Sequence, residues 1–214
     1  MVTTTRHRRA LPPTGAWRGD VVYVVGSGPS ALAADLAGIN AAAAEGRARV
    51  IAVNHACHDL PDADLIYSKD IGLYRAQEGH PTCCHDLTQR SRSACVMSIG
   101  ARGDLDAWRD ALDDLVVIQE WPRSHPGQCG PWPASLDEPL VTCGNSGVGA
   151  LCLADLLTDG DGEVHLVGLD MDRHPYTQWA RWFDEGGYAF AVRARVVVHG
   201  DTALDPSGRW ERVA

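Results

Sequence analysis

The sequence predicts an α/β fold: a Rossmann-like, mostly parallel, doubly wound sheet in a single domain. Short β-branched runs alternate along the chain with alanine- and leucine-rich segments of helical length, which is the order of a parallel sheet with crossover helices. The first run passes into a helix through a glycine turn, as in nucleotide-binding βαβ units. With 214 residues, 45% of them hydrophobic and 22% charged, the chain has the size and composition of one globular domain.

The opening unit is predicted to be a strand, a helix and a second strand. Residues 21–25 (VVYVV) form a β-branched run bounded by glycine, as expected of a strand buried on both faces. Pro29 suits a first helical position, and the alanine-rich run 31–44 favours a helix that Gly46 ends. Residues 49–53 are the second strand. Connections this short fit a right-handed parallel crossover.

The rest of the chain continues this alternation. The later predicted strands cover residues 64–67, 94–99, 115–118, 163–167 and 193–198, and the later predicted helices cover residues 105–112 and 146–157. Five prolines and two glycines between 119 and 142 exclude regular structure there and predict a surface excursion or lid. Residues 1–19 lack apolar periodicity and predict a flexible basic arm, which leaves 20–214 as the nucleotide-binding domain.

Charge and cysteine content limit the partners. A formal net charge of -9 argues against broad binding to nucleic acids or acidic membranes, although the basic residues at 6–9 keep nucleic acid open. No run of 18 apolar residues and no apolar signal core is present, so we expect a cytoplasmic protein without a membrane partner. The seven cysteines follow no regular spacing, which favours free thiols over a disulfide framework.

The most informative motif is a glycine turn between the first predicted strand and the first predicted helix. It reads Gly26-Ser27-Gly28-Pro29-Ser30. Glycines there let backbone N–H groups approach an anion, and a helix N-terminus adds partial positive charge, so phosphate is the expected ligand. No lysine follows the glycines, so the motif is not a Walker loop. The alternative is a tight turn that binds nothing.

Asn54 follows the second predicted strand, where dinucleotide-binding proteins carry an acid for the ribose. Its amide can donate and accept, which suits a phosphate, a ribose or a base edge and weakens the case for a nicotinamide cofactor. Capping of the segment that begins at His55 is the other interpretation.

Further polar residues follow other strands and open the later helix. The expected ligand contacts among them are Ser68, Asp70, Asn145, Ser146, Gly147 and Asp170. Because the carboxyl ends of parallel strands line one crevice, these residues should converge with the first turn. Asn145 and Ser146 equally suit ordinary helix caps, and Asp170 suits a loop carboxylate that caps the next segment of the chain.

These motifs together resemble a known family. The order GSGPS, VIAVNHA with ADLIYSKD after it, and GNSGVGALCLADLL followed by EVHLVGLDM is similar to a group of Rossmann-like proteins. The group includes bacterial sialyltransferases of the Campylobacter type, motility accessory factors that glycosylate flagellin, and archaeal 6-hydroxymethyl-7,8-dihydropterin pyrophosphokinase. The resemblance spans residues 21–72 and 143–171.

The resemblance implies a nucleotide bound across the crevice and a group transferred from it. The residues that match the family's nucleotide contacts are Gly26, Gly28, Pro29, Ser30, Asn54, Ser146 and Gly147. By analogy with the general base and phosphate-binding tyrosines of the sialyltransferases, His199 is the expected base, and Tyr176 and Tyr188 are the expected tyrosines.

Two reactions and one binding role fit this interpretation. The leading hypothesis is a nucleotide-dependent transferase, a glycosyltransferase that uses a nucleotide-activated sugar and needs no metal, since histidine can take a hydroxyl proton and tyrosines can stabilise the leaving phosphate. The first alternative is a pyrophosphokinase, in which Mg²⁺ would bind Asp70 or Asp170. The second is a nucleotide-binding module without turnover. The acceptor can be a glycan, a protein or a pterin, and the composition permits a homo-oligomer.

Two other clusters allow competing interpretations. His80, Cys83, Cys84 and His85 are soft ligands, but their spacing lacks a paired CxxC, which argues against zinc without excluding it. Trp179, Trp182 and Phe183 recur at near-helical spacing, and we interpret them as a packed face rather than a platform for a sugar.

Overall fold

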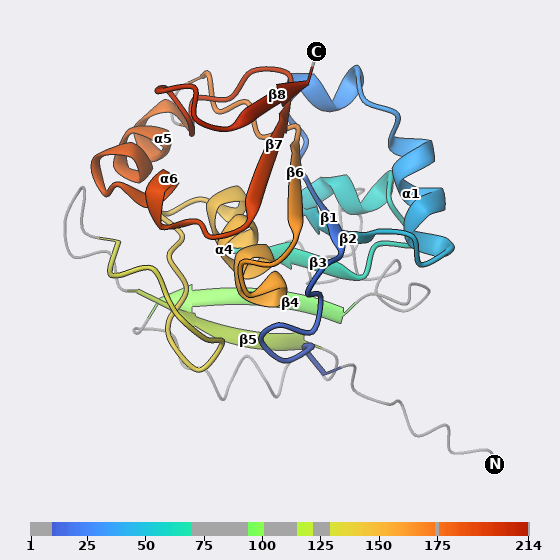
Figure 1. Ribbon diagram of the computed structural model, residues 1–214, viewed down its shortest axis with the longest axis horizontal. Coiled ribbons are helices and arrows are strands. Elements are labelled where there is room, and N and C mark those ends of the chain that lie inside the picture. The colour runs from blue at the N-terminus through green and yellow to red at the C-terminus, as the bar shows by residue number, and fades with distance from the viewer. Residues whose placement is uncertain (1–9, 70–93, 101–114, 122–128, 174–175, 214) are drawn as a thin grey trace, which may run out of the picture.

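A computed structural model describes residues 10–69, 94–100, 115–121, 129–173 and 176–213 (Figure 1). The described strands form one eight-stranded sheet in the order β5-β4-β3-β2-β1-β6-β7-β8, and every neighbouring pair is parallel. The strands are β1 (Val21–Val25), β2 (Arg49–Val53), β3 (Leu65–Ser68), β4 (Ala94–Gly100), β5 (Leu115–Glu120), β6 (Glu163–Val167), β7 (Arg195–His199) and β8 (Glu211–Val213). This sheet confirms the predicted Rossmann-like α/β fold.

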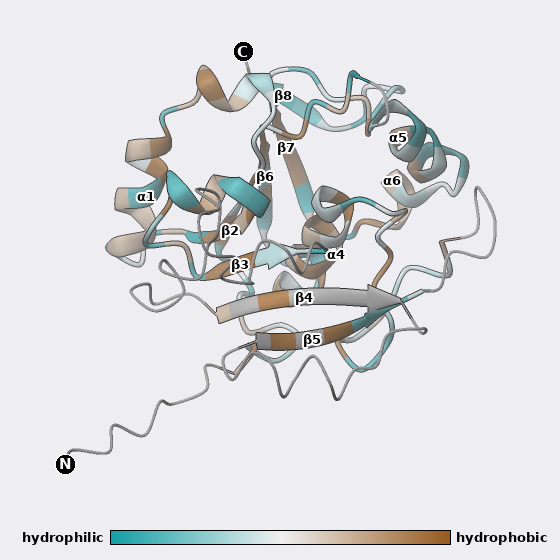
Figure 2. Cartoon of the chain, turned by 180° about the vertical axis from the view of Figure 1, so that it is seen from behind, coloured by the Kyte–Doolittle hydropathy of each residue, from teal (hydrophilic) through white to brown (hydrophobic). Residues whose placement is uncertain are grey.

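Helices cover both faces of the sheet. They are α1 (Leu36–Ala44), α4 (Ser146–Thr158), α5 (Tyr176–Glu185) and α6 (Tyr188–Ala191), with short 3₁₀ helices η1 (Pro29–Leu32) and η2 (Asn54–His58). Figure 1 shows α1 on one side of the sheet and α4, α5 and α6 on the other. Each side has its own apolar core, and hydrophobic residues recur along the strands between them (Figure 2).

The order of the strands reverses beside β1, because the chain builds outward through β2 to β5 and then returns to place β6 against the free side of β1. β1 and β6 pair over their whole length, from Val21 opposite Glu163 to Val25 opposite Val167. The two strands therefore end at the same level. Such a reversal leaves a crevice at the carboxyl ends of the strands, which is where ligands bind in open α/β sheets.

Helix α4 lies at the centre of the larger core. All of its residues from Gly147 to Thr158 are buried, as expected of a helix that is apolar on every side. The helix comes close enough to the sheet that a Cβ at Gly149 would overlap the Tyr67 hydroxyl. Glycine at this position therefore lets α4 pack directly over β3.

Residues 10–19 differ from the expected loose arm. Trp17 is only 3% exposed and packs into the larger core. The backbone N–H groups of Gly15 and Trp17 donate to the carbonyl oxygens of Leu156 and Leu157, over 3.0 and 2.8 Å. The tryptophan supplies enough apolar surface to fix the segment against the end of α4. Residues 1–9 lie outside the described part.

The predicted helix over 31–44 is wrong in its first half. Residues 29–32 form η1, and α1 begins only at Leu36. The reason is Asp35, whose Oδ1 accepts a hydrogen bond from Gly38 N over 2.8 Å and so caps a new helix. Alanine propensity alone could not show this break.

The predicted absence of regular structure over 119–142 holds for residues 129–139, which form no helix or strand, but parts of the segment are buried and do not lie on the surface. β5 extends to Glu120, which forms a parallel bridge with Leu140. Leu140 and Val141 are fully buried, and Trp132 packs against the larger core. Apolar side chains thus attach this irregular segment to the core despite its prolines. The predicted helix over 105–112 lies outside the described residues.

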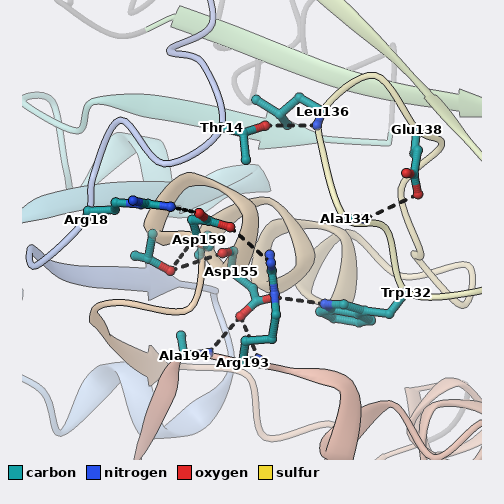
Figure 3. A network of polar contacts seen from close by, with 12 residues as sticks. Thr14, Arg18, Trp132, Ala134, Leu136, Glu138, Asp155, Asp159, Arg193 and Ala194 are labelled. Atoms are coloured by element: carbon teal, nitrogen blue, oxygen red, sulfur yellow. Dashed lines mark hydrogen bonds and ion pairs between the residues drawn. The ribbon is translucent and has the colours of Figure 1, made fainter.

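A buried carboxylate ties four distant segments together (Figure 3). Asp155 on α4 is fully buried and accepts hydrogen bonds from Trp132 Nε1 and from the backbone N–H groups of Arg193 and Ala194, each over 2.8 Å. The guanidinium of Arg193 bonds Asp155 and also Asp159, which pairs with Arg18. The network joins the N-terminal segment, the 129–142 segment, α4 and the start of β7.

We expect Asp155→Ala to lower the free energy of unfolding by about 3 kcal/mol, because it leaves buried N–H donors without an acceptor. Urea unfolding followed by circular dichroism measures the loss. Asp184→Ala, at an exposed position on α5, is the matched control and should stay within about 0.5 kcal/mol of the wild type. Equal unfolding midpoints for the two variants would contradict this role of Asp155.

Candidate functional site

A cavity of about 320 Å³ opens where the strand order reverses. Its walls come from the segments after β1, β2 and β6, from the start of α4 and from Tyr176 at the start of α5. The lining residues are Gly26, Ser27, Gly28, Pro29, Val53, Asn54, His55, Asn145, Gly147, Gly168, Leu169, Asp170, Met171, Asp172, Arg173 and Tyr176. Most of the predicted nucleotide contacts are therefore brought together.

The turn after β1 packs directly on the turn after β6. Gly26 N donates to Val167 O over 2.8 Å, and Gly28 N donates to Gly168 O over 2.9 Å. A Cβ at Gly26 would lie 2.5 Å from Gly168 O, and one at Gly28 would lie 2.6 Å from the same oxygen. Gly168 itself has φ +67°. These glycines are needed for the contact between the two turns.

Asp170 places its carboxylate on this glycine turn. Ser30 N donates to Asp170 Oδ2 over 3.0 Å, and Ser30 Oγ accepts from Gly168 N over 3.0 Å. A Cβ at Gly28 would overlap the same Oδ2 atom. Asp170 as a whole is 8% exposed and lines the cavity. An anion of the protein itself therefore occupies the backbone position at which the sequence predicted a phosphate.

The side chains of Asn54 and Ser68 are hydrogen-bonded to each other beside the cavity. Asn54 adopts φ +53°, a left-handed conformation that asparagine tolerates better than most residues. Its Oδ1 accepts from Ser68 Oγ over 2.7 Å, and Ser68 is fully buried. Asn54 is the first residue of η2, and the N-cap position belongs to Val53, so Asn54 does not occupy the predicted cap position. Asn54 lines the cavity, whereas Ser68 supports it from behind.

The start of α4 combines capping with exposure to the cavity. Asn145 Oδ1 accepts from Gly147 N over 2.7 Å and from Val148 N over 3.2 Å, so the cap interpretation is confirmed for this residue. Ser146 Oγ accepts from Lys69 N over 3.2 Å and does not line the cavity. Asn145 and Gly147 do line it.

A buried ion pair supports this rim and was not predicted from the sequence. Lys69 follows β3, and its side chain, 12% exposed, pairs with that of Glu120 at the end of β5, which is 8% exposed. Lys69 Nζ also donates to Thr142 Oγ1 over 2.8 Å, which in turn accepts from Gly144 N over 3.3 Å. The only signal in the sequence is a charged residue where each of two strands ends.

The three expected catalytic residues do not come together. Tyr176 lines the cavity, is 48% exposed and makes an edge contact with Trp179 at a centroid distance of 5.3 Å. Tyr188 lies elsewhere, buried, and donates from its hydroxyl to Gly130 O over 2.6 Å. His199 is not among the lining residues. Asp70 lies outside the described residues.

Phe183 and Trp182, two of the three aromatic residues in question, support the packing interpretation. Phe183 is fully buried and lies within 6.3 Å, between ring centroids, of Trp132, Tyr188 and Trp210. Trp182 packs against the same core. These rings hold α5 and α6 on the sheet.

Charged groups of both signs line the cavity. Asp172 and Arg173 are exposed, with 3.9 Å between Arg173 Nε and Asp172 Oδ1. His55, at the start of η2, is exposed and stacks with His58 at a centroid distance of 6.0 Å. His55 and Asp172 were not predicted to belong to the site.

Metal-binding clusters and membrane-spanning helices are absent from the described part of the chain. No group of three or more His, Cys, Asp or Glu side chains there is arranged to hold a metal ion. The cluster of His80, Cys83, Cys84 and His85 falls outside those residues. No helix in the described ranges is long and apolar enough to cross a bilayer.

No protein-family model matches the sequence, and no curated protein matches it significantly.

A histidine pair lies on the sheet face that carries α1. His165 Nδ1 is 2.8 Å from His199 Nε2, and His165 Nε2 is 2.6 Å from Glu163 Oε1. The ring of Tyr23 lies 4.7 Å from that of His165 and 6.3 Å from that of His199, between centroids. Partial burial, and then the neighbouring His165, lower the pKa of His199 below its usual value.

The lowered pKa of His199 predicts a loss of stability in mild acid. The unfolded chain binds the proton more readily, so this contribution is fully present above a pH of about 6.5 and is lost as the pH falls toward the folded pKa. We expect His199→Gln to flatten the dependence of the melting temperature on pH below about 6.5. His55→Gln, at an exposed histidine, is the control. An unchanged pH dependence in His199→Gln would refute the prediction.

Proposed function

We propose that the chain is a nucleotide-dependent transferase that binds a nucleotide-activated sugar in the cavity and transfers the sugar to an acceptor. One observation supports this most directly. The three segments whose sequences resemble the nucleotide-binding group, Gly26–Ser30, Asn54 and Asn145–Gly147, contribute to the walls of one cavity at the reversal of strand order. A volume of about 320 Å³ suits the nucleoside part of a donor.

The rim supplies groups suited to the rest of the donor. Arg173 is exposed at the cavity and only weakly engaged with Asp172, so its guanidinium can bind donor phosphates. Tyr176 can donate a hydrogen bond to the phosphate that departs when the sugar is transferred. Both residues come from the segment after β6, so the donor would extend from the cavity toward α5.

The general base in this proposal is His55 in place of His199. His55 lines the cavity and is exposed, so it can reach an acceptor hydroxyl, whereas His199 bonds His165 on the face of the sheet. A neutral imidazole accepts the hydroxyl proton as the oxygen attacks the anomeric carbon, and the bond to the nucleotide phosphate breaks.

A magnesium-dependent pyrophosphokinase is the second candidate. Asp170 and Asp172 both line the cavity, and carboxylate oxygens are preferred ligands of Mg²⁺. This candidate would require ATP and would release AMP.

Ligand-induced stabilisation tests the proposed binding. A nucleotide-sugar should raise the melting temperature of the wild type without metal, because a ligand that binds only the folded chain stabilises it. Gly28→Ala should abolish the rise, because the new Cβ meets Gly168 O at 2.6 Å. Gly46→Asn, at a left-handed position with open space around it, is the control. A shift that requires ATP and Mg²⁺ would favour the pyrophosphokinase, and no shift with any nucleotide would refute both.

Turnover tests the role of His55. With the donor identified by that screen, His55→Gln should reduce kcat by about 10²- to 10⁴-fold while leaving donor binding intact, as expected when a general base is lost. His58→Gln is the matched control, because His58 stacks on His55 and does not line the cavity. Equal losses in the two variants would rule out His55 as the base.

A further inference from the structure

We infer that Asp170 makes the glycine turn a site for a hydroxyl-bearing group of the ligand and excludes phosphate from it. The inference rests on the proposed function in one respect: in a nucleotide, the hydroxyl-bearing group would be the ribose. The phosphates would then lie toward the rim, where Arg173 is exposed.

The backbone donors of the turn are already engaged within the protein. Ser30 N, the amide that would meet a phosphate at the start of η1, donates to Asp170 Oδ2 over 3.0 Å. Gly28 N donates to Gly168 O. Two N–H groups that a phosphate would need are thus satisfied by the protein, and a phosphate there would meet a carboxylate of like charge.

The carboxylate of Asp170, in contrast, can accept further hydrogen bonds. Asp170 is 8% exposed and lines the cavity, and within the described part of the chain Ser30 N is the one donor to its side chain. A carboxylate can accept about four hydrogen bonds. The carboxylate of Asp170 can therefore accept further hydrogen bonds from a ligand, and a vicinal diol supplies two O–H donors.

The backbone holds this carboxylate firmly in place. Ala203 N donates to Asp170 O over 2.9 Å, and Thr202 Oγ1 donates to the preceding carbonyl of Leu169 over 2.6 Å. Ser30 Oγ accepts from Gly168 N over 3.0 Å on the other side of the turn. The backbone is thus fixed on both sides, and a fixed acceptor binds a ligand hydroxyl at low entropic cost.

Asn54 and Asn145, which form another part of the cavity wall, have the complementary polarity. The side-chain oxygens of Asn54 and Asn145 are already engaged, by Ser68 Oγ and by the first amides of α4. What these two side chains can offer a ligand is therefore their amide N–H donors. Acceptor groups of a base or sugar suit that wall, and donor hydroxyls suit Asp170.

The experiment compares the wild type with Asp170→Asn and with the control Asp184→Asn, which changes an exposed carboxylate that does not line the cavity. Isothermal titration would use a ribonucleoside, its 2′- and 3′-deoxy forms, its monophosphate and inorganic pyrophosphate. Asp170→Ser serves as a second variant, and circular dichroism checks that each variant is folded.

For the wild type and Asp184→Asn we expect at least tenfold weaker binding of a deoxynucleoside than of the ribonucleoside. For Asp170→Asn and Asp170→Ser we expect that difference to fall below threefold and affinity for pyrophosphate to rise at least tenfold. Unchanged ribose discrimination, or no gain of pyrophosphate binding, would overturn the inference. If no protein binds any nucleoside or nucleotide, the proposed function fails, and the pyrophosphate comparison still decides the role of Asp170.

Discussion

The close contact between the turns after β1 and β6 is the constraint on which the site depends. The two strands run in register over five residues and end together, so their following turns must share one space. They can do so because glycine occupies positions 26, 28 and 168, where any Cβ would meet the backbone of the opposing turn. The cavity exists because this contact fixes one side of the crevice while α4 and η2 fix the others.

The same constraint explains why a glycine pattern is ambiguous about its ligand. Backbone N–H groups in a tight turn can bind any suitably placed anion, whether a phosphate or a carboxylate of the protein. Here the anion is Asp170, which lies 140 residues beyond Ser30 in sequence. Local sequence shows that donors are available. Only the strand order, which places β6 beside β1, shows which anion accepts hydrogen bonds from these donors.

The features that the sequence predicts are those governed by local patterns and by topology. The bounds of β1, β2 and β6 match the predicted runs, because β-branched residues flanked by glycine or polar residues specify a buried strand. The break before α1 was missed, since the cap formed by Asp35 overrides alanine propensity. Asn54 and Asp170 follow strands, so topology alone brings them to one edge. His199 also ends a strand, but its side chain lies on the face of the sheet beside His165. Side chains alternate between the two faces along a strand, so this outcome could not be foreseen without knowing which residues of β7 point to which face.

The charges around the cavity divide into two kinds. Lys69 with Glu120 is a buried ion pair, so it holds the rim in place. Asp172 and Arg173 are exposed and only weakly paired, so they can bind a ligand without breaking the scaffold. Asp170 belongs to both kinds. It stabilises the glycine turn by accepting a hydrogen bond from Ser30 N, and it also lines the cavity, where it can contact a ligand. Under the proposed function, the ligand would place hydrogen-bond donors against the glycine turn and negative charge near the rim, which is the polarity of a nucleotide that enters ribose first.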